Sequence, residues 1–409
     1  EGGRKWSRYT IIGLPSSESI DVQDNIITIS TKEKKQREKS SDPIKWIDDY
    51  YKKFKVYSDT TLPEFQGGLV GYFGFDSIKY FEPKIVPSKQ IDDLNTPDIR
   101  LIISKEILIF DKLNNKIFII VYSDKNIASY ENAVDKISNI DALISEFKAK
   151  KNDDLYPKHT DMRVSYHMTK SKFIKSVDSI KSYILNGDVM QVVLSQRMTI
   201  PFNNDALAFY KQLRSLNPSP YMYYLNLDGF SIIGSSPEIL VRLENQNLTV
   251  RPIAGTRPRG SDEGEDSLLE YDLKKDPKEI AEHLMLIDLG RNDIGRVSEV
   301  GTVRLTDRMI IEKYSHVMHM VSNVVSKLKS NLGLMDVLRA TFPAGTVSGA
   351  PKIRALEIIY ELESVKRGIY AGAIGYLGWN GNMDTAIAIR TCIIKDSLLN
   401  IQCGAGIVF

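Results

Sequence analysis

Two glutamates of a predicted helix have a spacing that suits metal chemistry. Glu279 and Glu282 lie three residues apart in "DPKEIAEHLMLIDLGRND", so a helix would place both carboxylates on one face. Asp276 is suited to cap this helix and Pro277 to begin it. Like charges on one face repel each other unless water or a cation lies between them, and Mg²⁺ prefers hard oxygen ligands. The pair therefore indicates either a Mg²⁺ site or a charged, solvated helix face.

An arginine follows a stripe of small residues in "DTAIAIRTC". We expect a strand near 384–394, in which Ala386, Ala388 and Arg390 alternate onto one face and isoleucines onto the other. Both faces look buried, and a buried guanidinium needs an anionic partner. Arg390 could bind a substrate anion in the space above the alanines, or it could form a structural salt bridge.

Three predicted loops that contain glycine could hold an anion through backbone N–H groups. They are Gly255-Thr256 in "PIAGTRPRG", the stretch Ala344–Pro351 before a predicted helix, and Gly404–Gly406. Glycine permits close approach of a ligand, and a helix N-terminus favours negative charge. The prolines of "PIAGTRPRG" exclude a central strand there, so we expect a basic loop. Each segment could also be an ordinary turn.

Isolated acid–base residues complete the chemical inventory. We expect a helix over roughly 315–328, which would place His316 and His319 on one face, and either histidine could act as an acid or base. No cysteine or further histidine joins them at metal spacing, so a zinc site is not expected. Glu238 follows "GSSP" at a strand start, where its carboxylate could reach a cleft. All three residues could equally be structural.

Composition excludes several classes of partner. The 409 residues include 54 Lys and Arg against 52 Asp and Glu, a net charge of +2, which gives no reason to expect nucleic acid or a membrane surface. No apolar run is long enough to span a bilayer. Cys392 and Cys403 flank a predicted hairpin turn and could face each other, but we expect two buried thiols in a reducing cytosol.

The chain order of predicted elements indicates an α+β protein with helices packed on sheets. Strand-like runs dominate the first third, where the charged segment 31–42 is expected to be a solvated loop. Periodicity is lost over 149–160, which predicts a domain boundary between residues 1–150 and 160–409. An amphipathic helix follows and ends at Asn186-Gly187. Paired strands come next, with one hairpin turn at Asp228-Gly229 and another around Gln246.

Nine ordered segments together resemble those of chorismate-utilising enzymes: "NPSPYMYYL", "GSSPEIL", "PIAGTRPRG", "AEHLMLIDLGRND", "KYSHVMH", "TFPAGTVSGAPK", "YAGAIGY", "AIAIRT" and "GAGIV". The likeness is dense over about 165–409 and loose before it, and it is greatest to the large subunit of anthranilate synthase, component I. The resemblance implies a two-domain sandwich of twisted antiparallel sheets with helices outside and a chorismate site between the sheets.

Two positions separate the activities within this family. Some aminodeoxychorismate synthases have a nucleophilic lysine where this chain has Ala254, and isochorismate and salicylate synthases have a water-activating lysine at the position of Gln191. Neither residue here can act as nucleophile or base. The resemblance therefore implies that ammonia comes from outside, normally from a glutamine amidotransferase subunit in a hetero-oligomer. An aminodeoxychorismate synthase large subunit lacking the lysine, and a non-catalytic tryptophan-binding or scaffold subunit, remain alternatives.

The resemblance also assigns roles by position in the first committed step of tryptophan biosynthesis. Glu282, with Glu279, would hold Mg²⁺. Glu238 would be the general acid for the departing 4-hydroxyl, His319 would take part in eliminating pyruvate, and Thr346 would border the site. Chorismate would contact Gly255, Thr256, Tyr370, Arg390, Gly404, Ala405 and Gly406. Feedback inhibition by tryptophan would involve Pro220, Tyr221 and Met222.

The family pattern extends beyond both ends of this sequence. It usually includes an earlier leucine–glutamate–serine element, whose serine also contacts tryptophan. After "GAGIV" it continues into a helix that supplies a second glutamate ligand for Mg²⁺. We expect both segments to lie outside the sequence given.

Overall fold

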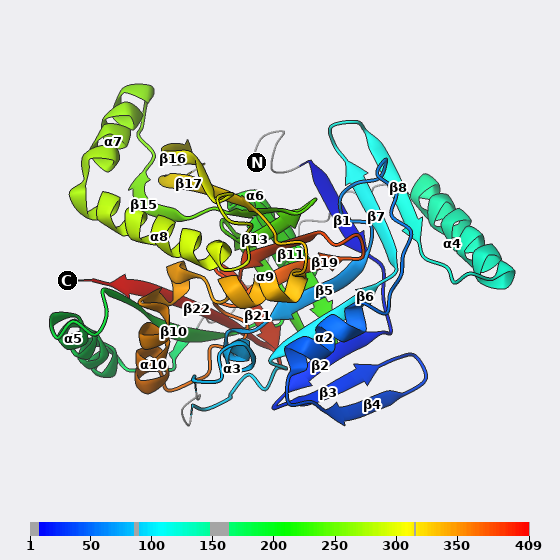
Figure 1. The fold of residues 1–409 in the computed structure, drawn as a ribbon, viewed down its shortest axis with the longest axis horizontal. Coiled ribbons are helices and arrows are strands. Elements are labelled where there is room, and N and C mark those ends of the chain that lie inside the picture. Colours follow the sequence, from blue (N-terminus) through cyan, green and yellow to red (C-terminus); the bar gives the residue numbers. More distant parts are fainter. Residues whose placement is uncertain (1–7, 86–89, 148–162, 315, 409) are drawn as a thin grey trace.

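A computed structural model describes residues 8–85, 90–147, 163–314 and 316–408 of the chain. Antiparallel sheets form its framework, with helices on their outer faces (Figure 1). This arrangement confirms the predicted α+β class and the sandwich of antiparallel sheets. None of the helices in these four ranges is long and apolar enough to cross a membrane.

The largest sheet contains strands from both halves of the sequence. Its order is β15 (Ile253–Pro258), β17 (Val317–Lys327), β14 (Asn247–Val250), β13 (Ile239–Glu244), β20 (Met383–Ile387), β19 (Ala373–Gly378), β5 (Gly68–Phe73), β6 (Ile99–Ser104), β2 (Ser19–Gln23), β3 (Ile26–Ser30) and β4 (Lys35–Lys39), and β16 (Arg304–Lys313) also pairs with β17. The β5–β19 pairing joins the ranges 1–150 and 160–409 in one sheet. The predicted boundary at 149–160 lies outside the described residues, and the division into two domains stays a prediction.

A second sheet lies across from the first and a third is small. The second has the order β11 (Tyr221–Leu227), β12 (Phe230–Ser236), β21 (Thr391–Lys395), β22 (Leu398–Ile407), β10 (Gln191–Pro201) and β18 (Gly349–Ala350), with β9 (Ser165–Tyr166) also on β10. The small sheet is β1 (Tyr9–Gly13), β7 (Glu106–Asp111) and β8 (Lys116–Val121). The hairpins predicted around Asp228-Gly229 and Gln246 are present as β11–β12 and β13–β14. Cys392 on β21 is buried, but Cys403 on β22 is exposed, so the expectation of two buried thiols is wrong.

The helices form where apolar periodicity and capping residues agree. They are α2 (Pro43–Tyr51), α3 (Ile78–Phe81), α4 (Ile127–Glu146), α5 (Lys170–Leu185), α6 (Ala206–Leu216), α7 (Glu263–Lys275), α8 (Pro277–Gly295), α9 (Leu334–Thr341) and α10 (Lys352–Leu362). Helix α8 packs on β15 and β17, and α5 and α10 pack on β10. The Asp276 side chain accepts hydrogen bonds from the backbone N–H groups of Lys278 and Glu279, as a cap should.

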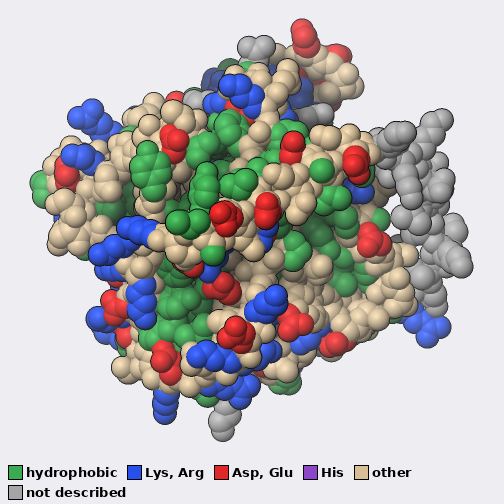
Figure 2. Space-filling view, turned by 90° about the vertical axis from the view of Figure 1, so that its right-hand side faces the viewer, with side chains coloured by type: hydrophobic (Ala, Val, Ile, Leu, Met, Phe, Trp, Pro, Cys, Tyr) green, Lys and Arg blue, Asp and Glu red, His purple; other side chains and the backbone are tan. Residues whose placement is uncertain are grey.

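The small sheet and α4 form one end of the molecule. Figure 2 views the molecule from this end, where hydrophobic side chains lie in patches between charged ones. Of α4 only Ala133 is buried, and Ile127, Tyr130 and Leu143 are exposed. Helix α4 therefore contributes little to the main core, which lies between the larger sheets and the helices on them.

Two predicted elements are wrong because strand pairing overrides the local pattern. The helix expected over 315–328 is instead strand β17, which pairs with β15, β14 and β16. Its valines suit a strand, and burial on both faces hides the period-two pattern that would have identified it. The charged segment 31–42, expected as a loop, contains edge strand β4, whose side chains are all exposed. Charged residues are common on edge strands because they discourage pairing with another chain.

Candidate active site

The chain crosses between the two large sheets at two adjoining places. One crossover joins β12 to β13 and contains Glu238, and the other joins β20 to β21 and contains Arg390. The backbone N–H of Ile387 donates to the carbonyl of Glu238 at 3.0 Å, and that of Ser235 donates to the carbonyl of Arg390 at 3.1 Å. The crossovers are thus hydrogen-bonded to each other at the seam between the sheets.

The single strand predicted near 384–394 is therefore wrong. Strand β20 ends at Ile387, and the chain turns through Arg390, whose φ is +49°, before β21 begins. The expected alternation fails because the chain leaves one sheet for the other, a change that a run of strand-forming residues does not reveal. The Arg390 side chain is exposed, and among the described residues it has no hydrogen-bond or ion-pair partner.

Glu238 is a buried carboxyl with one side-chain partner. Its side chain is 4% exposed, and the Thr346 hydroxyl donates to Glu238 Oε1 at 2.8 Å. Burial raises the pKa of Glu238 to about 8, against the opposing effects of the Thr346 bond, the Ile253 N–H and the Arg390 charge. Glu238 therefore holds a proton at neutral pH that it can give to a leaving group.

His319 lies on β17 beside the bulge at Gly255. Its Nδ1 is 3.2 Å from the Gly255 carbonyl oxygen and 3.1 Å from Thr256 Oγ1. Because a carbonyl can only accept, Nδ1 carries the proton of the neutral ring and Nε2 keeps a lone pair. Burial, together with the positive charge of Arg390, lowers the pKa of His319. His319 lies on a strand, and the exposed His316 precedes that strand. The prediction that the two histidines share a helix face is therefore wrong.

The segment "PIAGTRPRG" is an edge strand with a bulge, and the loop expected there is wrong. Residues 253–258 form β15, whose register shifts between Ala254 and Thr256. Gly255 has a φ of +65°, a conformation that favours glycine. A Cβ on Gly255 would lie 3.3 Å from Glu279 Oε2, so the bulge approaches the carboxylate face of α8. Prolines are tolerated because β15 is at the end of its sheet.

Glu279 and Glu282 share the face of α8 that the sequence predicts. Glu282 Oε1 accepts from Gln191 Nε2 at 3.4 Å, and burial and the Glu279 charge raise the pKa of Glu282. The sequence did not predict Arg257, which binds Asp272 and Asp276 and reaches Glu279 Oε1 at 3.4 Å. Within the described ranges no three His, Cys, Asp or Glu side chains form a metal-binding group. The two glutamates thus provide a pair of oxygen donors.

The segment Gly404–Gly406 belongs to strand β22, and the loop expected there is wrong. It pairs with β10, opposite Ser195, Leu194 and Val193. A Cβ on Gly406 would lie 2.5 Å from Gln191 Nε2, and one on Gly404 would lie 2.8 Å from Tyr370 Oη. Because glycine has no side chain, the exposed surface of this strand is open beside Gln191 and the buried Tyr370.

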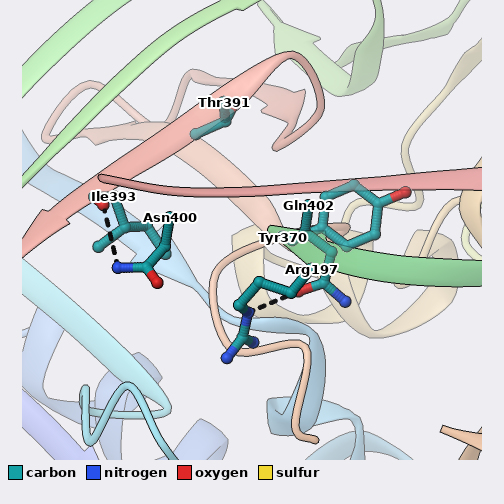
Figure 3. A pocket seen from close by; sticks show the side chains of 6 residues that line it. All are labelled: Arg197, Tyr370, Thr391, Ile393, Asn400 and Gln402. Carbon is teal, nitrogen blue, oxygen red and sulfur yellow. Dashed lines mark hydrogen bonds between the residues drawn. The ribbon is translucent and has the colours of Figure 1, made fainter. Parts of the chain in front are cut away.

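A small polar cavity adjoins Tyr370 (Figure 3). Its volume is about 10 Å³, and its walls are Arg197, Tyr370, Thr391, Ile393, Asn400 and Gln402. This is about the space that one water molecule requires. Arg197 Nε donates to Gln402 Oε1 at 3.2 Å across one wall. The cavity was not predicted, because its walls come from strands and a loop that are distant in sequence.

The residues predicted to bind tryptophan lie on the strand beside the Glu238 crossover. Pro220 precedes β11, where Tyr221 and Met222 pair with Ser236 and Ser235. The Tyr221 hydroxyl donates to Asp384 Oδ1 at 2.8 Å and accepts from Arg242 Nη2 at 3.0 Å. The segment is therefore one strand away from the seam, and Tyr221 already makes contacts of its own.

Known proteins share both the sequence and the fold. Residues 7–409 match the chorismate binding enzyme family. The anthranilate synthase component 1 of Pseudomonas aeruginosa is 49% identical over 417 residues, which cover 100% of this chain and 84% of that protein. The crystal structure of anthranilate synthase component I from Streptococcus pneumoniae superposes with a TM-score of 0.87 and 37% identity, covering 98% of this chain and 88% of that one.

A more distant structure shows how widely the fold occurs. The menaquinone-specific isochorismate synthase of Escherichia coli has the same fold at a TM-score of 0.71 and 18% identity. In sequence, this chain is much more similar to the Pseudomonas aeruginosa component 1 protein, with 49% identity over the whole of this chain. The chain therefore belongs to the chorismate binding enzyme family, among the anthranilate synthase component 1 proteins.

Proposed function

We propose that the chain converts chorismate and ammonia to anthranilate and pyruvate. The observation that carries this proposal is the seam between the sheets, where a protonated Glu238, an unpaired Arg390 and a neutral His319 come together. Ala254 and Gln191 provide no lysine nucleophile or base there. Ammonia from outside is then the nucleophile, which suits an anthranilate synthase rather than an isochorismate synthase.

Arg390 and the open strand at Gly404–Gly406 would bind and orient chorismate. A guanidinium without a partner can hold a substrate carboxylate through two parallel N–H bonds. The glycines let the substrate approach the β22 backbone, with Tyr370 beside them. Thr256 and Gly255 would border the substrate from β15, and Ala405 would lie beneath it.

Glu238 and His319 would move the protons of the two chemical steps. When ammonia adds at C2, the 4-hydroxyl leaves as water with the proton of Glu238, whose carboxyl Thr346 orients. In the second step a base removes the C2 proton, and the enolpyruvyl group leaves as pyruvate while the ring becomes aromatic. The lone pair of His319 Nε2 suits that base, because Nδ1 is held by the Gly255 carbonyl.

Glu279 and Glu282 are suited to hold Mg²⁺. Two oxygen donors fit this ion, which usually keeps several waters and takes one or two protein carboxylates. Burial and, after it, the Glu279 charge raise the pKa of Glu282. A cation would relieve the repulsion between the two carboxylates. When bound, Mg²⁺ would neutralise the ring carboxylate of the substrate and the charge that develops as the hydroxyl departs.

A partner subunit would supply the ammonia, and tryptophan would inhibit the reaction. A glutamine amidotransferase subunit would deliver ammonia in a cytoplasmic hetero-oligomer, as the name "component 1" of the relatives implies. Tryptophan would inhibit by binding at Pro220, Tyr221 and Met222, beside the crossover that carries Glu238.

Product identification tests the proposed activity. The protein is incubated with chorismate, Mg²⁺ and ammonium at a pH near the Glu238 pKa of about 8, where part of this carboxyl is still protonated. Glu238→Gln is the control. We expect fluorescent anthranilate and an equal amount of pyruvate from the unchanged protein only. Formation of 4-amino-4-deoxychorismate would assign the aminodeoxychorismate synthase activity instead, and no product from chorismate would leave only a non-catalytic role.

A further inference from the structure

A fully buried ion pair lies between α10 and β19, outside the residues assigned above. The Arg367 side chain is 1% exposed and that of Glu363 is 3% exposed. Arg367 Nε donates to Glu363 Oε2 at 2.9 Å, and Nη2 donates to Oε1 at 2.7 Å. Glu363 occupies the C-cap position of α10, so the pair is fixed to the end of that helix.

The remaining hydrogen bonds of the pair reach two other segments. Arg367 Nη1 donates to the carbonyl of Val347 at 2.6 Å, and Nη2 donates to that of Val193 at 2.7 Å. Glu363 Oε1 accepts from both the N–H and the hydroxyl of Ser195, each at 2.8 Å. One guanidinium thus joins α10, strand β10 and the short helix η2 (Gly345–Val347).

Two of the segments that the pair holds, η2 and β10, adjoin residues of the proposed active site. Val347 directly follows Thr346, whose hydroxyl is on Glu238. Val193 and Ser195 lie opposite the glycines of the open β22 strand. The Arg367 guanidinium also lies 5.7 Å from the centre of the Tyr370 ring. The pair therefore contacts the segment that carries Thr346 and the strand beside the β22 glycines. It is itself buried and does not reach the surface where chorismate would bind.

The chemistry of the pair favours a geometric role over a stabilising one. Removing two charges from water is costly, and a buried ion pair often stabilises a fold no more than apolar residues of the same volume would. What a planar guanidinium provides is a fixed fork of donors, and four of its bonds here point to three segments. A lysine has no such fork, so its ammonium would release one or more of these segments.

We propose that Arg367, paired with Glu363, is a positioning residue that holds the Thr346 hydroxyl on Glu238. This inference deepens the proposed function and rests on it for the role of Glu238. The bond to the Val347 carbonyl fixes η2, and η2 fixes Thr346. Arg367 thereby controls the protonation of the proposed general acid without contacting chorismate.

The consequence is a defined change in the titration of Glu238. The groups that favour its ionised form are the Thr346 hydroxyl, the Ile253 N–H and the Arg390 charge. If η2 moves, the first of these is lost while the other two remain, so the pKa of Glu238 rises. Because only the protonated form can act as general acid, the fall of the rate at alkaline pH then moves to higher pH, although the maximum rate falls.

The test compares Arg367→Lys, Thr346→Val and the double variant. We expect Arg367→Lys to lower kcat by about 10- to 100-fold, the size of effect that a small misplacement of catalytic groups causes. Its alkaline limb should move to higher pH, Thr346→Val should move the limb in the same direction, and the double variant should move it no further. Ser195→Ala, which removes one bond to Glu363, should give a smaller shift and keeps the ion pair.

Arg100→Lys is the matched control. Arg100 makes a two-pronged pair with Asp21, at 2.5 and 2.7 Å, between β6 and β2 rather than near η2. This control should lower the melting temperature without moving the pH limb. An unmoved limb in Arg367→Lys, or a double variant whose shift is the sum of the two single shifts, would overturn the positioning role.

A second measurement does not depend on catalysis. The free energy of unfolding is measured against pH with Glu238 and with Gln at this position, in the Arg367 and in the Lys background. A glutamate whose folded pKa is raised loses stability as pH rises, until pH passes that pKa. We expect the loss to continue to higher pH in the Lys background, and identical curves would refute the inference. A failure of the proposed function would show instead as no anthranilate from the unchanged protein.

Discussion

Glu238 and Arg390 lie on two hydrogen-bonded crossovers, so a buried carboxyl and an exposed guanidinium are fixed beside each other at the seam between the sheets. The charge of Arg390 favours ionisation of Glu238, yet burial has the larger effect and raises the pKa of Glu238 to about 8. A substrate anion on Arg390 would weaken that opposing charge. The seam can therefore keep a carboxyl protonated next to a bound carboxylate.

The pH dependence of the reaction should report Glu238. Its carboxyl is protonated below its folded pKa of about 8 and ionised above it, so kcat/KM should fall as pH rises through this value. The pH profile of kcat/KM with ammonia held in excess checks this, because ammonia itself ionises in the alkaline range. Glu238→Gln should abolish turnover at every pH. A full rate retained well above pH 8 would contradict the role of Glu238 as general acid.

Replacing Glu282 by Gln should impair the proposed Mg²⁺ site and leave the fold intact. Loss of one preorganised electrostatic partner typically costs about 2.7–4 kcal/mol, or roughly 10²–10³ in rate. We expect a fall of that order and a higher Mg²⁺ requirement in steady-state titrations. Asp288→Asn, at an exposed position of the same helix, is the control and should change neither. A Glu282→Gln enzyme with an unchanged Mg²⁺ dependence would remove the metal assignment.

Ala254→Lys should not simply improve the enzyme. Position 254 lies on β15 next to the Gly255 bulge, so a lysine amine there should compete with ammonia and either trap the ring covalently or block the site. Intact-mass measurement after exposure to chorismate distinguishes these outcomes. Ala254→Met, of similar length but without an amine, is the control for steric blocking. An unchanged mass with full anthranilate output would show that the assigned geometry is wrong.

Met222→Thr should weaken inhibition by tryptophan while turnover stays nearly intact. Met222 pairs with Ser235 on β12, one strand away from the Glu238 crossover, so binding there is separate from the chemistry but adjacent to it. Initial rates over a tryptophan titration provide the measurement. Tyr224→Phe, on the same strand, is the control and should leave inhibition unchanged. Equal losses of inhibition and turnover in Met222→Thr would mean that the segment serves the active site.

The sequence by itself determined the elements that depend on neighbours along the chain. The apolar period and the Asp276 cap specify α8, and they place Glu279 and Glu282 on one face. The hairpins at Asp228-Gly229 and Gln246 follow from turn residues between strand-forming runs. The sequence likewise shows that positions 191 and 254 are not lysine. Together with the resemblance to the family, this absence implies an external nucleophile.

Only the tertiary structure decided where these elements meet. Strand β17 looked helical, because a strand buried on both faces has no alternation to detect. The residue types of 384–394 do not indicate that the chain changes sheets between β20 and β21. The Arg367 guanidinium, paired with Glu363, donates hydrogen bonds to the carbonyls of Val193 and Val347, which are distant in sequence. Such contacts depend on strand pairing and packing between residues far apart in sequence, and these effects add up over many residues. Periodicity and capping, in contrast, act within a few residues of each position.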